Sequence, residues 1–284
     1  MAGKESPVAQ RRRLLGELKQ ARERLGLSQG SVAEALDWSQ SKVLRIEQGK
    51  SGISVTDLRA LLLHYGITEL GKVSELVDMA RAAKRPEWMA KYRGLVKEFA
   101  EFLELESVAV RCRYVQTSLI PGMLQTRRYA TAIMTGGGED LEEVRRGVDM
   151  RMHRQDLLGP AAPDMYFIID ESALYRMVGG TDVMREQLLR VKELATADRM
   201  SIQIVPFSAG LHPAMKGSFA IIEISEEDDS RTLFLEELYR PSQLRDDPEV
   251  VREYLNYFFQ LEKFALPAIE TPHVIDERLK HLGG

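Results

Sequence analysis

The stretch that decides the fold is GLSQGSVAEALDWSQSKVLRIEQGK, residues 26–50. Its spacing predicts two short helices joined by a tight turn. Ser28 is placed to cap the first helix, which buries an apolar side that includes Val32, and Ser39 is placed to open the second. Gly49 supplies the left-handed residue that commonly ends a helix. The stretch therefore predicts a DNA-binding helix-turn-helix.

The second helix, residues 40–48, should present one face to a DNA groove. A turn of roughly 100° per residue places Val43 and Ile46 inward and the polar residues on the opposite side. Residues at the start of such a helix approach base edges, whereas basic and amide side chains around it contact phosphates. We assign base readout to Gln40, Ser41, Leu44 and Arg45, and phosphate contact to Gln29, Lys42 and Lys50. The full set of predicted DNA-binding residues is Gln29, Ser39, Gln40, Ser41, Lys42, Leu44, Arg45, Gln48 and Lys50.

The flanking sequence favours a DNA-binding bundle over an ordinary helical hairpin, which the central pattern alone also fits. Residues 14–25 predict an amphipathic helix before the motif. Ser54 and Asp57 form a capping-box pattern that opens a fourth helix through Tyr65. Residues 68–84 predict a fifth helix, with Leu70, Val73, Leu76, Val77 and Ala80 on one side. We therefore expect an all-α five-helix domain over residues 1–85.

These residues resemble the Cro/cI-type, or xenobiotic-response-element-type, helix-turn-helix family. The resemblance runs from about Leu14 to Gly66 and rests on Leu27-Ser28-Gln29, Val32-Ala33, Ser39, Val43, Ile46-Glu47 and Gly49-Lys50. Two positions depart from the family pattern. Asp37 stands where the turn usually carries glycine, and Gly30-Ser31 follows Ser28-Gln29 where acidic residues are common. Aspartate tolerates the left-handed region better than most residues, so the first departure is mild.

Charge and composition agree with an intracellular regulator. Residues 1–85 hold 15 lysines and arginines against 10 acidic residues, whereas residues 86–284 hold 24 against 33, so the basic part is the predicted DNA part. Cys112 is the only cysteine, which excludes an intramolecular disulfide. No apolar run approaches the length of a membrane span or a signal peptide. We expect no membrane association, a cytoplasmic location, and association with the nucleoid when DNA is bound.

Residues 86–284 predict an α+β domain for regulation, dimerisation or partner binding. A long helical stretch with an aromatic stripe is expected from Glu87 to about Val108, after a junction near 84–90. A turn at 118–122 should lead into a helix through Tyr129 and Ile133, followed by a flexible break at 135–138. The expected strands are 110–117, 165–169, 200–206, 218–224 and 232–238, and the later helices are 141–158 and one that begins at Pro248.

The same part resembles a second known unit, the actinobacterial family of WhiJ-like regulators. The segments that carry the resemblance are Leu119-Ile120-Pro121-Gly122-Met123-Leu124-Gln125-Thr126 with Tyr129-Ala130, Arg151 with Arg154-Gln155, Asp170-Glu171-Ser172-Ala173-Leu174, and Val205-Pro206 through Lys216-Gly217-Ser218-Phe219. In that family a Cro/cI-type head precedes a domain of unassigned biochemical function that is often described as antitoxin-like. The resemblance implies a repressor-like protein that is frequently paired with a small protein encoded by a neighbouring gene.

The sequence offers weak candidates for catalysis, and we expect no enzymatic activity. Asp170 and Glu171 are adjacent on a strand, so their carboxylates should point to opposite faces. The histidines show no metal-ligand spacing and no cysteine partner. We therefore predict no catalytic residue, no metal and no cofactor. The loop 207–217 is a candidate for effector or partner binding through Phe207, His212 and Lys216, and an ordinary connector is the alternative.

These patterns predict a transcription regulator that binds a palindromic operator in double-stranded DNA as a homodimer. A single head reads only a few base pairs, so two-fold symmetry is the usual route to specific affinity. The second domain should modulate the two heads. The alternative is an antitoxin-like interaction protein that sequesters a small partner protein and autoregulates its own operon.

Overall fold

A computed structural model of the protein describes residues 7–47, 52–82, 97–138, 140–158, 162–224, 231–236 and 242–282. The chain divides into two compact units, Met1–Arg93 and Gly94–Gly284. The domain boundary expected between residues 85 and 86 lies outside the described residues, as do Gln48, Gly49 and Lys50 and the start of the helix expected from Glu87.

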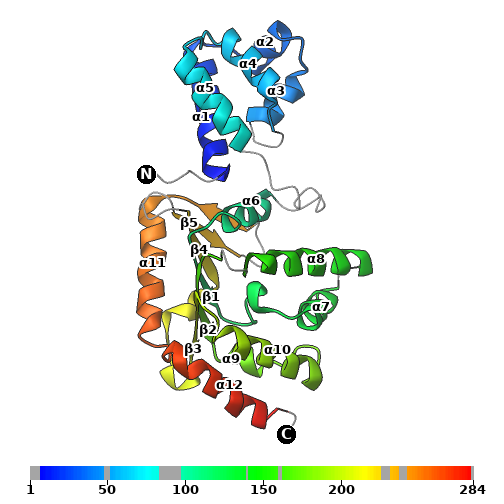
Figure 1. The fold of residues 1–284 in the computed structure, drawn as a ribbon, viewed down its shortest axis with the longest axis vertical. Helices are drawn as coiled ribbons and strands as arrows, with labels where there is room; N and C mark the ends of the chain where they lie inside the picture. The colour runs from blue at the N-terminus through cyan, green and yellow to red at the C-terminus, as the bar shows by residue number, and fades with distance from the viewer. Residues whose placement is uncertain are drawn as a thin grey trace. The chain divides into compact units, whose positions relative to one another are not determined.

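The amino-terminal unit contains five helices within its described residues (Figure 1). They are α1 (Pro7–Arg24), α2 (Gln29–Ala35), α3 (Gln40–Glu47), α4 (Val55–His64) and α5 (Leu70–Ala82). All five contribute to one apolar core, in which α1 supplies Leu14 and Leu18 and α4 supplies Leu58 and Leu62. The expected all-α domain is confirmed.

Local hydrogen bonds explain where the short helices begin. The hydroxyl of Ser28 accepts from the backbone N–H of Ser31 at 3.0 Å, and that of Ser39 accepts from Lys42 N–H at 3.2 Å. Such bonds satisfy backbone donors that a helix start leaves open. Between the helices, Asp37 has φ +52°, so the turn does require the left-handed conformation that glycine usually supplies.

Two expectations about apolar faces are wrong. Leu70 is 86% exposed because it is the first residue of α5, one turn ahead of the part of the helix that packs on the core. Leu25 lies beyond the end of α1 and is also exposed. The amphipathic patterns therefore place these helices correctly but extend their buried faces too far.

The carboxy-terminal unit is built around a six-stranded sheet in the order β3-β2-β1-β4-β5-β6. The strands are β1 (Arg111–Gln116), β2 (Asp164–Asp170), β3 (Met200–Val205), β4 (Phe219–Glu223), β5 (Arg231–Leu235) and β6 (Gln243–Arg245). β1, β2 and β3 are parallel, whereas β4 pairs antiparallel with β1 and β5 continues the antiparallel part. Strand β1 is therefore the point at which the parallel half meets the antiparallel half.

Helices cover both faces of this sheet (Figure 1). They are α6 (Lys97–Glu106), α7 (Arg127–Gly136), α8 (Leu141–Arg154), α9 (Ser172–Tyr175), α10 (Thr181–Leu194), α11 (Pro248–Glu262) and α12 (Thr271–Lys280). Figure 1 shows α11 along one face and α7, α8 and α10 on the opposite side. The core under α11 joins Phe258 and Leu261 to Val115, Ile221 and Leu233 of the sheet. The expected α+β class is confirmed.

Several element boundaries in this unit differ from the prediction. The α-helix expected over 141–158 ends at Arg154 and continues as a short 3-10 helix, Gln155–Leu158. The break expected at 135–138 begins later, because α7 extends to Gly136. The sequence interpretation did not identify α9, α10, α12 or β6.

Candidate functional site

Helix α3 presents a polar face on the surface of the amino-terminal unit. Val43 and Ile46 are buried, and the opposite side exposes Ser41, Leu44 and Arg45, as the helical spacing predicts. Gln40, at the start of the helix, is exposed as well. Among the described residues the guanidinium of Arg45 has no hydrogen-bond or ion-pair partner. All of its donors are thus open to an external acceptor, and a guanine edge or a phosphate matches their geometry.

Two of the predicted phosphate contacts already have partners inside the unit. The ammonium of Lys42 lies 2.9 Å from Oδ1 of Asp57 and 3.9 Å from the ring centroid of Trp38. The amide of Gln29 donates to Oε2 of Glu47 at 2.7 Å. A lysine ammonium has three donors, so Lys42 keeps capacity for a second acceptor. The phosphate roles of both residues stay predictions.

A buried ion pair fixes α3 against the first two helices, and the sequence interpretation missed it. Glu47, at the end of α3, accepts from Arg22 of α1 through Nε at 2.6 Å and Nη2 at 3.0 Å. The side chains of Glu47 and Arg22 are 6% and 11% exposed. The hydrogen bond to Glu47 raises the pKa of Arg22. Residues 25 positions apart share no local pattern, so only the folded chain shows this pair.

The loop 207–217 does not expose all of its predicted binding residues. His212 is 6% exposed, and its Nε2 lies 3.1 Å from Oδ2 of Asp170 at the end of β2, so its assignment to an exposed loop surface is wrong. Phe207 is 59% exposed. Lys216 is exposed, with Nζ 5.0 Å from the ring centroid of Tyr257, and it lines a hollow of about 280 Å³ beside α11.

The two adjacent carboxylates at the end of β2 both hold this loop. Asp170 contacts His212, whereas Oε2 of Glu171 accepts from the backbone N–H of Phe207 at 2.6 Å. Their contacts are with different residues of the loop. Within the described ranges, no three histidine, cysteine or acidic side chains are grouped so that they could hold a metal ion.

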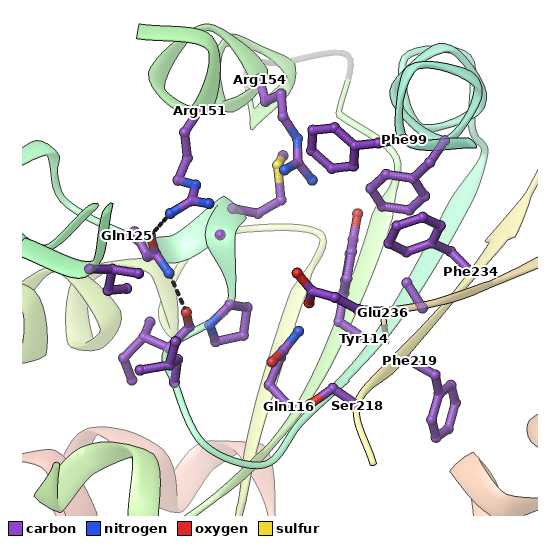
Figure 2. A pocket seen from close by; sticks show the side chains of 18 residues that line it. Phe99, Tyr114, Gln116, Gln125, Arg151, Arg154, Ser218, Phe219, Phe234 and Glu236 are labelled. Atoms are coloured by element: carbon purple, nitrogen blue, oxygen red, sulfur yellow. Dashed lines mark hydrogen bonds between the residues drawn. The ribbon is translucent and has the colours of Figure 1, made fainter. Parts of the chain in front are cut away.

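A cleft of about 200 Å³ gathers segments that lie far apart in the sequence (Figure 2). Most segments of the WhiJ-like resemblance reach it: the turn through Pro121, Gly122 and Gln125, helix α8 through Arg151 and Arg154, and the start of β4 at Ser218 and Phe219. Aromatic side chains complete its wall, namely Phe99, Phe102, Tyr114 and Phe234. The segments of the WhiJ-like resemblance lie far apart in the sequence, and nothing in the sequence indicates that they meet in a cleft. The sequence therefore predicted no site from them.

Beneath this cleft lies a buried ion pair. Arg154 donates to Glu106 through Nε at 2.9 Å and Nη2 at 2.7 Å, and the hydroxyl of Tyr114 donates to the same carboxylate at 2.5 Å. Burial acts to lower the pKa of Arg154, but the charge and hydrogen bonds of Glu106 outweigh it and raise that pKa. Burial also raises the pKa of Tyr114 well above its usual value. The opposite charges of Arg154 and Glu106 cancel, so this pair adds no net charge to the base of the cleft.

The comparisons with known proteins agree with the two-unit organisation. Residues 13–71 match the family model of a helix-turn-helix domain, which supports a DNA-binding regulator. No curated protein and no solved structure matches the chain. Among the described residues no helix has the length and apolar character needed to cross a membrane. Residues 99–277, more than half of the chain, match a domain of unknown function, DUF5753. The chain therefore belongs to the DUF5753 family.

Proposed function

We propose that the protein is a sequence-specific, repressor-like transcription regulator whose helix α3 reads the major groove. The observation that carries this proposal is the exposed face of α3, on which Arg45 has its donors open while Val43 and Ile46 anchor the helix. Gln40 and Arg45 are the side chains suited to paired hydrogen bonds with adenine and guanine. The Cro/cI-type and WhiJ-like resemblances support the same role.

The regulator acts as a homodimer on a palindromic operator. One helix-turn-helix head contacts only a few base pairs, and two heads related by a two-fold axis double that number. The carboxy-terminal unit modulates the heads rather than performing catalysis. Asp170 and Glu171 contact different residues of the loop 207–217, which does not favour them as a catalytic pair.

The test is selection of bound duplexes from a random pool with the full chain and with two variants. Arg45→Ala should relax the preference at one operator position and cost about 1–3 kcal/mol on the selected site. Arg81→Ala is the matched control, because Arg81 is an exposed arginine on α5 that pairs with Asp78. Equal losses on selected and random DNA for Arg45→Ala would refute base readout by this residue.

A second candidate function is the binding of a small partner protein, in the manner of an antitoxin. It is favoured by two exposed aromatic side chains that lie together, since the rings of Phe207 and Tyr175 have centroids 5.5 Å apart. Met177 and Leu211, close to them in the sequence, are also exposed. Such surfaces commonly mark partner sites. Co-expression with the small protein of a neighbouring gene tests this function. Stoichiometric co-purification that Phe207→Ser abolishes supports it, and separate elution of the two proteins opposes it.

A further inference from the structure

The cleft of Figure 2 lies beside strand β1, where the parallel part of the sheet meets the antiparallel part. Strand β1 has β2 on one side, parallel, and β4 on the other, antiparallel. Gln116 is the last residue of β1, Ser218 immediately precedes β4, and both line the cleft. In open α/β sheets, ligands bind beyond the carboxyl ends of strands at the point where strand order reverses. Its position thus favours the cleft as a ligand site.

Two groups of opposite charge line this cleft. Arg151 of α8 donates to Gln125 at 2.7 Å, and Gln125 in turn donates to the carbonyl of Ile120 at 2.7 Å, so the guanidinium is held by a chain of hydrogen bonds. Figure 2 shows Arg151 and Gln125 on one side of the cleft and Glu236 across from them. The second arginine of the lining, Arg154, pairs with Glu106.

The carboxylate of Glu236 and the amide of Gln116 make no hydrogen bond and no ion pair among the described residues, although the charge of Glu236 also acts on Arg154 and helps to raise its pKa. Both line the cleft, so each is available to a ligand. A guanidinium selects a carboxylate, with which it forms two parallel hydrogen bonds, and a carboxylate selects an ammonium group. A ligand that satisfies both sides therefore carries both charges.

The remaining wall is aromatic. Phe102 and Phe234 stack with ring centroids 4.3 Å apart, and Phe99 lies 6.1 Å from Phe102. These rings favour an apolar or aromatic group over a second polar one. At roughly 30 Å³ per water, a cleft of about 200 Å³ corresponds to roughly seven waters, the scale of a metabolite rather than a protein segment.

We propose that this cleft binds a free amino acid with an apolar or aromatic side chain, as the effector of the regulator. Arg151 binds the α-carboxylate, Glu236 binds the α-ammonium group, and the side chain contacts Phe99, Phe102 and Phe234. A free amino acid carries both charges together with a side chain, so it matches the two charged sides and the aromatic wall of the cleft. The regulatory consequence rests on the function proposed above, whereas the binding does not.

The experiment is calorimetric titration of the full chain with the set of L-amino acids and with two stripped probes. These probes are 3-phenylpropanoate, which lacks the amine, and 2-phenylethylamine, which lacks the carboxylate. We expect binding of L-phenylalanine or another apolar amino acid, and at least about tenfold weaker binding of each probe, because each loses a charge-assisted interaction. Failure of every amino acid to bind up to its solubility limit would overturn the proposal.

Variants assign the binding to the cleft. Arg151→Ala should remove the advantage of the amino acid over 2-phenylethylamine, and Glu236→Gln should remove its advantage over 3-phenylpropanoate. Arg145→Ala is the matched control, since Arg145 lies exposed on the same helix and contacts only Glu142 among the described residues. Should Arg151→Ala fail to fold, the exposed Glu236 still provides the test. Unchanged selectivity in Glu236→Gln would overturn the assignment.

A DNA-binding titration separates this proposal from the proposed function. An amino acid that binds and also changes the affinity for the selected operator supports both. An amino acid that binds while the chain shows no affinity for any duplex supports the ligand site and contradicts the regulator. Normal operator binding with no amino-acid binding overturns the ligand site alone.

Discussion

Replacing Glu47 by alanine should destabilise the amino-terminal unit and abolish its DNA binding. Glu47 accepts two hydrogen bonds from Arg22 and one from Gln29, and the side chains of the ion pair are only 6% and 11% exposed. Removing one partner of a buried pair typically costs about 3–5 kcal/mol, because the other charge stays buried without compensation. Arg22 keeps a bond from Nη1 to the carbonyl of Leu27 at 2.7 Å, so we expect the lower end, about 3 kcal/mol.

Tryptophan fluorescence during urea unfolding measures this loss in the intact chain. The chain has two tryptophans, Trp38 and Trp88. In a Trp88→Phe background, Trp38 reports on the amino-terminal unit alone, since it packs against that unit's core. With a slope of about 1–1.5 kcal/mol per molar urea, a loss of about 3 kcal/mol lowers the midpoint by about 2–3 M.

Two further variants test whether the loss of stability comes from the ion pair of Glu47 with Arg22. Glu47→Gln keeps an acceptor oxygen and should lose less stability than the alanine variant. Glu23→Ala is the matched control, because this exposed glutamate lies 3.8 Å from the same arginine, and its removal should change stability by less than about 0.5 kcal/mol. A loss below about 1 kcal/mol for Glu47→Ala, or a loss equal to that of Glu23→Ala, would refute the reasoning.

Three other predictions concern stability. Glu106→Gln leaves buried Arg154 without its charge partner and should cost about 3–5 kcal/mol, measured by thermal unfolding; no change in Tm would contradict a buried pair. Asp37→Val should destabilise by about 1–2 kcal/mol in urea, because φ is +52° there, whereas Asp37→Gly should be tolerated; equal effects of the two would refute the conformational argument. Burial raises the pKa of Cys112 in the folded chain, so its contribution to stability is present below the unfolded-state pKa and is lost as pH rises above about 8.5. Burial raises the pKa of Tyr114 as well, and its contribution is lost only as pH rises above about 10. The urea midpoint should therefore fall between about pH 7.5 and 10, and a constant midpoint would contradict this.

The helix-turn-helix was predictable because its determinants are local. The hydroxyl of Ser28 caps α2 by accepting a hydrogen bond from a backbone N–H three residues later in the chain. Val43 and Ile46 repeat at helical spacing, so one short window of sequence contains the whole pattern. The need for a left-handed residue at Asp37 was equally local. The same reasoning fails for Arg22 and Glu47, whose pairing depends on how three helices pack.

The carboxy-terminal unit was predictable in its class and in the positions of its first five strands, but not in the order of the strands or in all of its helices. Helix α10 buries Val183, Met184, Leu188 and Val191 on one side, a spacing that is typical of an amphipathic helix. The cleft was not accessible to the same reasoning, because its walls come from α6, α8, β1 and β5. His212 was misplaced for a similar reason: a loop rich in glycine and proline suggests exposure, but contact with Asp170 buries its ring.

The most direct test of the central claim, that the exposed face of α3 meets duplex DNA, is the dissociation constant of the full chain for its selected operator as a function of salt. The account predicts that the logarithm of the association constant falls linearly with the logarithm of salt concentration, as phosphate contacts release counterions. It also predicts that Arg45→Ala removes much of the preference for that operator over random DNA. A chain that binds no duplex at any salt concentration, or whose operator preference survives Arg45→Ala unchanged, would contradict it.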